Sequence, residues 1–248
     1  ATTHRGIRLT RVPTTVLAQN DSGVGVKNGI NAFDTKNFLG TFAPPFAVLS
    51  DIRFIDTLEE RDKRSGMAEA VKVSLIRDPG FFAWMEEHSD DLARFEVSAM
   101  AIMIRRCAEL HMAHIAGGGD PFEFGSARPL DFGHWAAHKL EALTHYELRH
   151  GEAVAIGLAL DCRYAVEIGL LDEKIQRRIH ALLQGLGFTL KHDALSDETA
   201  VLQGLREFRE HLGGELSITM IRDVGDALDV HHMAEDQVRM AIRWLRAA

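Results

Sequence analysis

The stretch Phe132–His138 (Phe-Gly-His-Trp-Ala-Ala-His), followed by His150–Gly157 (His-Gly-Glu-Ala-Val-Ala-Ile-Gly), places three histidines in two neighbouring helix-like segments. His134 and His138 are four residues apart, so they project from one face of a helix. His150 opens a second apolar run that can fold back beside the first. The grouping predicts half of a metal site. Since the chain has 13 histidines, chance spacing is the alternative explanation.

A carboxylate that could complete this site lies upstream, in Ser65–Val73 (Ser-Gly-Met-Ala-Glu-Ala-Val-Lys-Val). Glu69 stands there among small and apolar residues at helical spacing. Glutamates are rarely buried unless they are paired or bound to a metal, so Glu69 on an apolar face calls for a cation. Lys72, three residues further on, shares its face.

Composition is that of a soluble enzyme. The chain has 248 residues, of which 46% are hydrophobic and 26% charged, so it can bury a substantial core. The net charge of −8 disfavours binding to nucleic acid or to an anionic membrane. Cys107 and Cys162 lack metal-like or redox spacing and predict a reduced, cytoplasmic protein with two packing cysteines. The longest apolar runs are too short to span a bilayer.

Periodicity predicts an α/β remnant followed by a mainly α-helical domain. Short strands are expected at 7–12 and 46–49, with loops at 22–29 and at the Pro44-Pro45 pair. From Leu58 onward, apolar residues recur at three- and four-residue spacing. The predicted helices are 63–76, 79–94, 97–116, 132–143, 151–168, 172–186, 197–211 and 234–246. We expect a division into residues 1–60 and residues 61–248.

Six short motifs occur in an order that resembles 3-dehydroquinate synthases and, more widely, the sugar phosphate cyclases. They are Arg11–Thr15 (Arg-Val-Pro-Thr-Thr), Asp21–Lys27 (Asp-Ser-Gly-Val-Gly-Val-Lys), Lys36–Gly40 (Lys-Asn-Phe-Leu-Gly), Gly66–Lys72 (Gly-Met-Ala-Glu-Ala-Val-Lys), Phe132–His134 (Phe-Gly-His) and His150–Gly157. Together they are far more specific than any single motif. The resemblance implies a dehydroquinate synthase-like fold, bound NAD, a divalent metal such as zinc or cobalt, and a homodimer.

The resemblance also implies a reaction. Glu69, His134 and His150 match the three metal ligands, and a carboxylate with two imidazoles and open positions is typical of catalytic rather than structural sites. The family oxidises a seven-carbon sugar phosphate with NAD, eliminates phosphate, reduces the ketone again and closes a carbocycle by an aldol step. The cofactor ends unchanged and carries the hardest chemistry.

Further residues are assigned by the same resemblance. Lys27, Asn37 and His138 match positions that hold the phosphate, whereas Asp21 and Lys72 match contacts to the sugar hydroxyls. Catalysis is expected to involve Asp21, Lys27, Lys72, Asp131 and His138. The positions that match the NAD site are Thr14, Thr15, Lys36, Asn37, Phe54, Thr57, Leu58 and Asp62. Each lysine could instead be an ordinary solvated charge, the default for this residue.

Departures from the 3-dehydroquinate synthase pattern bear on the substrate. His111 stands where a lysine associated with the substrate carboxylate is expected, and Asp131 replaces an asparagine. Arg128 is one position nearer to His134 than the family's carboxylate-binding arginine. His211 stands where a synthase lysine is expected, in a segment that resembles the 2-epi-5-epi-valiolone synthase branch. Because a lost cation opposite a carboxylate costs a few kcal/mol, these changes favour a neutral polyol head group, as in sedoheptulose 7-phosphate. Asn37, His111, Arg128 and His211 are the expected substrate-binding residues.

Other interpretations remain open. One is a 3-dehydroquinate synthase of the shikimate pathway, and another is an iron- or zinc-dependent alcohol dehydrogenase of related architecture. In the resembled family, roughly a hundred earlier residues build most of the NAD domain with a glycine-rich phosphate turn. Because no such turn is present, we expect a fragment or truncated member. A non-catalytic relative is therefore the third alternative. No nucleic-acid or membrane partner is expected.

Overall fold

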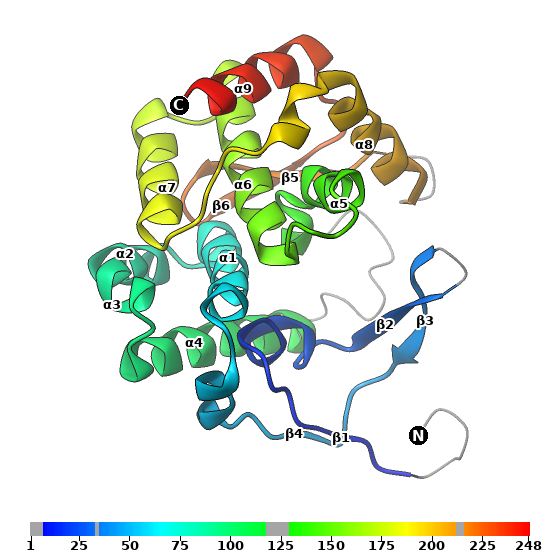
Figure 1. The fold of residues 1–248 in the computed structure, drawn as a ribbon, viewed down its shortest axis with the longest axis vertical. Helices are drawn as coiled ribbons and strands as arrows, with labels where there is room; N and C mark the ends of the chain where they lie inside the picture. Colours follow the sequence, from blue (N-terminus) through cyan, green and yellow to red (C-terminus); the bar gives the residue numbers. More distant parts are fainter. Residues whose placement is uncertain (1–6, 33–34, 118–128, 212–215) are drawn as a thin grey trace.

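The computed structural model of the chain describes residues 7–32, 35–117, 129–211 and 216–248. Within these ranges, side chains are described except at 27–28, 30–32, 35–39, 41–42, 129 and 210–211. Figure 1 shows a small, strand-containing part built by the first 50 or so residues beside a larger helical part. This agrees with the predicted α/β remnant and mainly helical domain.

The N-terminal part is built from two pairs of strands and two short helical turns. The strands β1 (Thr10–Arg11) and β4 (Ala47–Val48) pair in parallel, while β2 (Lys27–Ala32) and β3 (Thr35–Phe42) form an antiparallel hairpin. Between and after them lie a π-helical turn, η1 (Ala18–Ser22), and a 3-10 turn, η2 (Ile52–Thr57). The predicted loop at 22–29 is wrong from Lys27 onward, because Lys27 to Gly29 pair with β3.

Helix α1 (Glu60–Arg77) is the central element of the helical part. Every residue from Ser65 to Ile76 is buried, so the helix is enclosed on all sides and not only along one stripe. The helix ends at Arg77, and its C-cap Asp78 is not helical, as expected because a residue that precedes a proline disfavours helical backbone angles. Around α1 pack helices α2 (Pro79–Glu87), α4 (Val97–Ala116) and α6 (His150–Glu167).

The remaining helices follow the predicted periodicity with small differences in their bounds. Segment 79–94 is not one helix, because the chain breaks at His88 into α2 and α3. Segment 132–143 begins two residues late, since Gly133 has a left-handed φ of 77°. The elements are α2 (Pro79–Glu87), α3 (Ser89–Ala93), α4 (Val97–Ala116), η3 (Pro129–Asp131), α5 (His134–Leu143), α6 (His150–Glu167), α7 (Glu173–Gly185), η4 (Asp193–Ser196), α8 (Glu198–His211) and α9 (Glu235–Ala247).

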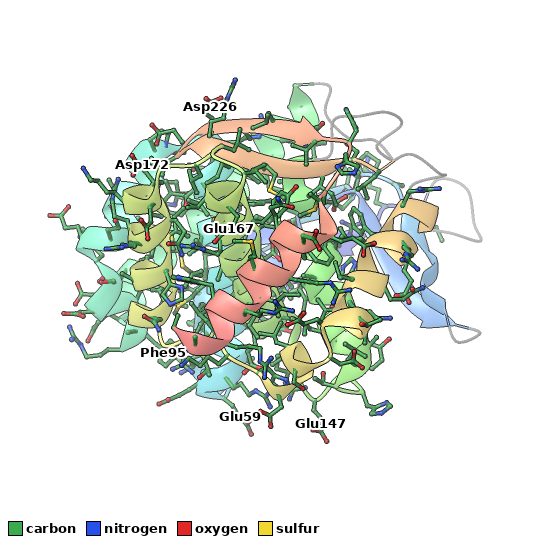
Figure 2. The ribbon with its side chains drawn as sticks, turned by 90° about the horizontal axis from the view of Figure 1, so that it is seen from above. Glu59, Phe95, Glu147, Glu167, Asp172 and Asp226 are labelled. Atoms are coloured by element: carbon green, nitrogen blue, oxygen red, sulfur yellow. The ribbon has the colours of Figure 1, made fainter. Side chains whose placement is uncertain are left out.

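A second hairpin, β5 (Ile218–Asp223) and β6 (Asp226–Val230), was not predicted. One core extends through the helical part, and both cysteines are free and buried in it, as expected. Seen from above, Glu59, Glu147 and Asp226 lie at the rim of the molecule, whereas α6 runs through its interior (Figure 2). None of the helices in the described ranges has both the length and the apolarity that crossing a bilayer requires.

Candidate metal centre

Three helices bring the predicted ligands together. Glu69 lies in the middle of α1, while His134 and His150 are the first residues of α5 and α6. The close approach of α1 and α6 depends on Gly151, where a Cβ atom would lie 1.8 Å from the Ser65 carbonyl oxygen. The Gly151 amide also donates a hydrogen bond of 3.0 Å to Ser65 Oγ. The residue after His150 therefore anchors α6 on the helix that carries Glu69.

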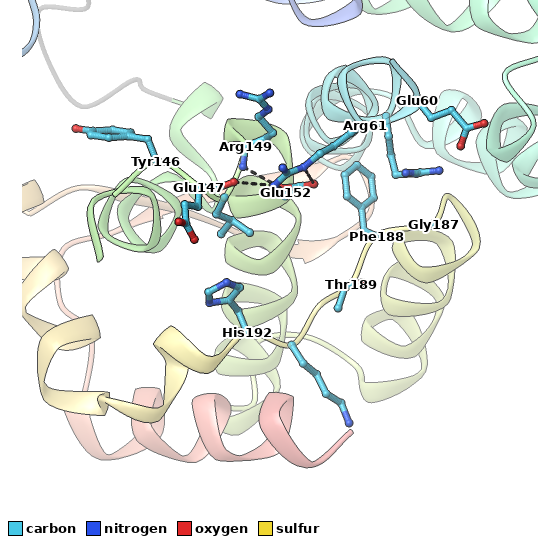
Figure 3. A pocket seen from close by; sticks show the side chains of 13 residues that line it. Glu60, Arg61, Tyr146, Glu147, Arg149, Glu152, Gly187, Phe188, Thr189 and His192 are labelled. Carbon is cyan, nitrogen blue, oxygen red and sulfur yellow. Dashed lines mark hydrogen bonds and ion pairs between the residues drawn. The ribbon is translucent and has the colours of Figure 1, made fainter. Parts of the chain in front are cut away.

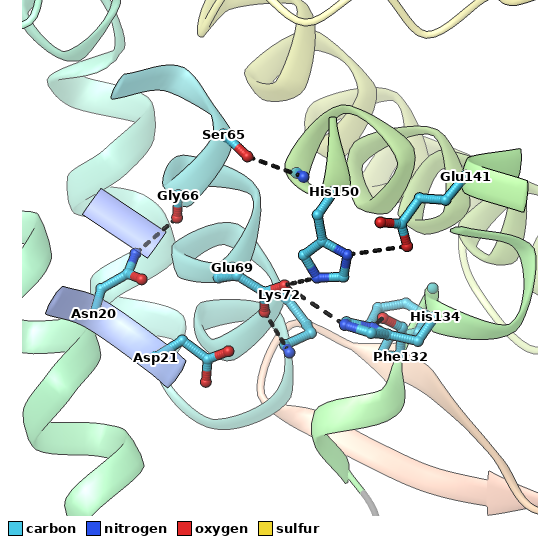
Figure 4. Close-up of polar contacts among 12 residues, drawn as sticks. Asn20, Asp21, Ser65, Gly66, Glu69, Lys72, Phe132, His134, Glu141 and His150 are labelled. Carbon is cyan, nitrogen blue, oxygen red and sulfur yellow. Dashed lines mark hydrogen bonds and ion pairs between the residues drawn. The ribbon is translucent and has the colours of Figure 1, made fainter. Parts of the chain in front are cut away.

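The side chains of Glu69, His134 and His150 point toward one another (Figure 4). Glu69 Oε1 lies 3.5 Å from His134 Nε2 and 3.3 Å from His150 Nε2. One ligand atom from each residue falls within 4.8 Å of the other two. The spacing is compact enough for one metal ion to reach all three groups.

The hydrogen-bond partners of Nδ1 in His134 and His150 indicate which protons the Nε2 atoms carry. His134 Nδ1 lies 3.0 Å from the Phe132 carbonyl oxygen, and His150 Nδ1 lies 3.2 Å from Glu141 Oε2. Both partners can only accept, so each Nδ1 carries a proton, and each Nε2 of a neutral ring presents a lone pair to Glu69. Lone pairs facing a carboxylate oxygen require a cation between them, either added protons or a metal. One oxygen and two imidazole nitrogens suit zinc or cobalt.

Electrostatics of the site favours a bound cation. The Glu69 side chain is 0% exposed. Its burial raises the pKa, but Lys72, His134 and His150 outweigh that effect and hold the pKa of Glu69 well below its ordinary value. Burial lowers the pKa of His150, yet hydrogen bonds to Glu141 and Glu69 outweigh it and raise that pKa to about 9. Without a metal the ring therefore holds an extra proton, which metal binding would release.

Lys72 neutralises the Glu69 carboxylate at Oε2, whereas the two histidines face Oε1. Its ammonium, on a side chain only 2% exposed, forms an ion pair with Glu69 Oε2. Burial lowers the pKa of Lys72, but the nearby charges of Glu69, Asp21 and Asp131 outweigh this effect and raise it above the ordinary value. The structure thus brings three predicted site residues, Lys72, Asp21 and Asp131, into one electrostatic group with Glu69.

Asp21 and His111 form a close pair beside this group. His111 Nδ1 lies 2.7 Å from Asp21 Oδ1, linking α4 to η1. Burial raises the pKa of Asp21, but the contact with His111 and the charge of Lys72 outweigh it, so the pKa of Asp21 is lowered. His111, which stands where a lysine is expected, therefore contacts the carboxylate of Asp21.

His138 and Glu141 stand next to the ligand group. The His138 ring centroid lies 5.5 Å from that of His134 and 6.2 Å from that of His150. His138, Glu141 and His150 also place ligand atoms within 4.8 Å of one another. Because Glu141 Oε2 lies against His150 Nδ1, we interpret Glu141 as the group that orients this ring. Sequence reasoning missed Glu141, although it lies three residues after His138 and seven after His134, on the same helix face.

The positions expected at the NAD site lie along one stretch of chain, from the segment before η1 to the start of α1. Thr15 Oγ1 accepts a hydrogen bond of 3.1 Å from the Ala18 amide, and Thr57 Oγ1 donates one of 2.7 Å to the Phe54 carbonyl. Asp62 lies 3.5 Å from Arg149. Thr14 is exposed, and Leu58 is half-buried. The side chains of Lys27, Lys36, Asn37, Arg128 and His211, also expected at the site, lie outside the described residues.

A surface cavity of about 900 Å³ lies at the N-terminal ends of α1 and α6 (Figure 3). Arg61 crosses it, with a bidentate ion pair to Glu152 at 2.6 and 2.7 Å. None of Glu69, His134 and His150 lines this cavity, and Arg61 within it is already paired with Glu152. We therefore place the chemistry at Glu69, where donor atoms converge, and not in this cavity.

Comparison with known proteins extends these observations. Residues 1–65 match the family described as 3-dehydroquinate synthase N-terminal, and residues 66–207 match the family described as 3-dehydroquinate synthase C-terminal. A 3-dehydroquinate synthase from Halorhodospira halophila is 38% identical over 229 residues, which are 92% of this chain and 64% of the relative. A 2-epi-valiolone synthase from Actinosynnema mirum is 33% identical over 249 residues, covering 98% of this chain and 64% of the relative.

Solved structures agree. A 2-epi-5-epi-valiolone synthase from Streptomyces hygroscopicus with NAD+ and Zn2+ bound superposes with a TM-score of 0.89 at 30% identity, covering 97% of this chain and 66% of that one. A 2-deoxy-scyllo-inosose synthase complexed with carbaglucose-6-phosphate, NAD+ and Co2+ has the same fold, with a TM-score of 0.80 at 24% identity, covering 97% and 68%. The chain spans 64% of the length of the Halorhodospira relative.

Proposed function

This chain belongs to the 3-dehydroquinate synthase family, and from that premise we propose that it acts as a sugar phosphate cyclase. Such an enzyme is a carbon–oxygen lyase that converts a seven-carbon ketose phosphate into a carbocycle with loss of phosphate. The observation that carries the proposal is the convergence of Glu69, His134 and His150 beside the buried Lys72. A structural metal site would have four protein ligands, whereas these three leave open positions for a substrate.

Two bound groups are part of the proposal. Glu69, His134 and His150 would hold a divalent zinc or cobalt ion, and NAD would lie along the stretch from Thr14 to Asp62. When bound, the metal would polarise substrate oxygens as a Lewis acid, while NAD would accept a hydride and return it. The buried Glu69 oxygens and the two inward-facing imidazole nitrogens support the metal assignment. The NAD assignment is supported by the family and by the solved relatives.

The residues around the centre have separate tasks in this proposal. Lys72 keeps Glu69 charged and holds a substrate hydroxyl through its remaining protons. The lowered pKa of Asp21 keeps its carboxylate ionised, because burial is outweighed by His111 and Lys72, so it can accept a hydrogen bond from a hydroxyl. His138 lies beside both histidine ligands and is placed to meet the phosphate, as the family resemblance implies.

Charge favours a neutral head group on the substrate. Among the described residues, three carboxylates, Glu69, Asp21 and Asp131, surround the single ammonium of Lys72. His111 lies against Asp21 and so offers no independent cation to a substrate carboxylate. A polyol such as that of sedoheptulose 7-phosphate hydrogen-bonds to such groups, whereas a carboxylate would be repelled. We therefore propose a sedoheptulose 7-phosphate-like substrate.

The second candidate is 3-dehydroquinate synthase activity on 3-deoxy-arabino-heptulosonate 7-phosphate. The identity to the Halorhodospira enzyme favours it.

The homodimer, the cytoplasmic location and the division at residue 60 stay predictions. An alcohol dehydrogenase would accumulate NADH with a simple alcohol, whereas a cyclase recycles its cofactor.

Phosphate release tests the proposal. The complete gene product is incubated with NAD and zinc or cobalt and given the two seven-carbon phosphates in parallel. We expect release from sedoheptulose 7-phosphate, lost in His134→Ala and retained in His145→Ala, a matched change at an exposed histidine. Release from 3-deoxy-arabino-heptulosonate 7-phosphate alone would transfer the assignment to the second candidate. Release from neither, with metal and NAD bound, would contradict both and favour a non-catalytic relative.

A further inference from the structure

A fully buried carboxylate on α6 faces the turn that precedes His134. Asp161 is 0% exposed and accepts two hydrogen bonds, 3.0 Å from the Gly133 amide and 2.7 Å from Trp135 Nε1. Its two donors come from the residues on either side of His134. None of the motifs that indicated the site includes Asp161.

The two bonds at Gly133 and His134 meet in one peptide group. The Gly133 N–H that Asp161 binds and the Phe132 C=O that accepts from His134 Nδ1 at 3.0 Å belong to the same peptide unit. A carboxylate on the N–H side polarises the peptide and makes its carbonyl a stronger acceptor. The hydrogen-bonded sequence runs from Asp161 through this peptide to His134 Nδ1, and His134 Nε2 then faces Glu69.

Packing holds this arrangement in place. A Cβ atom at Gly157, one turn before Asp161, would lie 2.0 Å from the Gly133 carbonyl oxygen. Gly133 itself has a φ of 77°, a backbone conformation that favours glycine. Helix α6 therefore lies directly against the turn, at a distance that only glycines allow, and presents Asp161 to it.

His150 provides the internal comparison. Its Nδ1 lies 3.2 Å from the Glu141 carboxylate directly, whereas His134 reaches a carboxylate only through a peptide. Carboxylate partners of a ligand histidine select its tautomer, orient the ring and raise its basicity. Each histidine of the candidate centre thus has a buried acid behind it.

We propose that Asp161 is a positioning residue for His134, acting through the Phe132–Gly133 peptide to fix the ring and strengthen its bond to the metal. The inference rests on the proposed role of Glu69, His134 and His150 as metal ligands. Trp135 holds the second oxygen of Asp161 and so directs the first toward Gly133.

The test is zinc affinity measured by chelator competition at pH 8. Asp161→Asn keeps the size of the side chain but removes the charge and sets an NH2 group against one of the two N–H donors. We expect about 10- to 100-fold weaker zinc binding. The matched control is Tyr164→Phe on the same helix, which removes the part-buried hydrogen bond of 3.1 Å that the Tyr164 hydroxyl accepts from the Ala234 amide and should leave zinc affinity unchanged. An Asp161→Asn variant that loses thermal stability but keeps wild-type zinc affinity would overturn the proposal.

Two further arms keep the outcome clear. His150→Ala should lose zinc; if it retained stoichiometric zinc, the ligand set itself would fail, independently of Asp161. If Asp161→Asn did not fold, the wild-type chain would supply the test, because coupling between sites is reciprocal. Zinc loading should then slow hydrogen exchange at the Gly133 amide and the Trp135 indole, but not at the Ala234 amide. Unchanged exchange at both of the first two groups would also overturn the proposal.

Discussion

Replacing Lys72 by methionine should destabilise the metal-free chain strongly. Lys72 is 2% exposed and Glu69 is 0% exposed, so the change removes the ammonium partner of a buried carboxylate and leaves the protonated His150 ring beside it. Removing one member of a buried ion pair typically costs about 3 to 5 kcal/mol, because the other charge stays uncompensated. For a chain of this size the corresponding fall in melting temperature is about 6 to 20 °C.

The control is Lys139→Met, the same substitution at an ion pair with Glu207, whose side chain is 50% exposed. A pair open to solvent contributes only about 0 to 1 kcal/mol. Both variants would be unfolded by heat and by urea, once with a chelator and once with zinc. Zinc should narrow the gap between Lys72→Met and wild type, because the metal then supplies the charge that Glu69 lacks. The reasoning is refuted if Lys72→Met loses no more stability than Lys139→Met in chelator.

Three further outcomes are expected. Zinc at a hundred times its dissociation constant should stabilise the wild-type chain by about 2.7 kcal/mol in a thermal scan, and an equal melting temperature with and without zinc would contradict metal binding to the folded state. Glu141→Gln should weaken zinc binding about 10- to 100-fold in a competition assay, since it removes the carboxylate behind His150; wild-type affinity would exclude an orienting role. Burial raises the pKa of Asp161 from 3.8 to about 7, so between these values the folded chain holds a proton that the unfolded chain has released. Stability from this group is therefore present at low pH and lost as the pH rises toward and through 7, by up to about 4 kcal/mol. The stability difference between wild type and Asp161→Asn, measured by urea unfolding in chelator from pH 5 to 8, should shift with that slope, and a constant difference would contradict the raised pKa.

The helices were predictable because apolar spacing reports burial directly. The same spacing predicted a helix at 63–76, within α1, but not that this helix is buried on all sides. Its small residues and Glu69 pointed to an interior cation. The hairpins β2–β3 and β5–β6 were missed. The first pairs Gly29 with Gly40 and carries more polar than apolar residues, so it lacks the apolar alternation that identifies a strand. The second begins with a short apolar run in β5, and a run of that length does not distinguish a strand from a helix.

The grouping of Glu69, His134 and His150 in the candidate site was predictable from the sequence, but the residues behind them were not. Glu69 was identified as a charge in an apolar helix, and His134 and His150 were identified by their positions in the motifs. Glu141 and Asp161 were missed, although Glu141 shares a helix face with His134 and Asp161 follows the apolar run 153–160. An acid in a helix is usually solvated, and only packing shows that these two are buried behind the histidines. His111 was expected to face the substrate, but the pairing with Asp21 depends on how α4 meets η1, which the chain order does not reveal.

X-ray absorption at the zinc edge is the measurement to make first, since it reports the donor atoms around the metal in this chain. We expect one zinc per chain, with two imidazole nitrogens at about 2.0 to 2.1 Å and a carboxylate oxygen at about 2.0 to 2.2 Å. In His150→Ala the imidazole signal should fall together with the bound zinc. A sulfur shell at about 2.3 Å, or an unchanged imidazole shell in His150→Ala, would contradict the assignment of Glu69, His134 and His150.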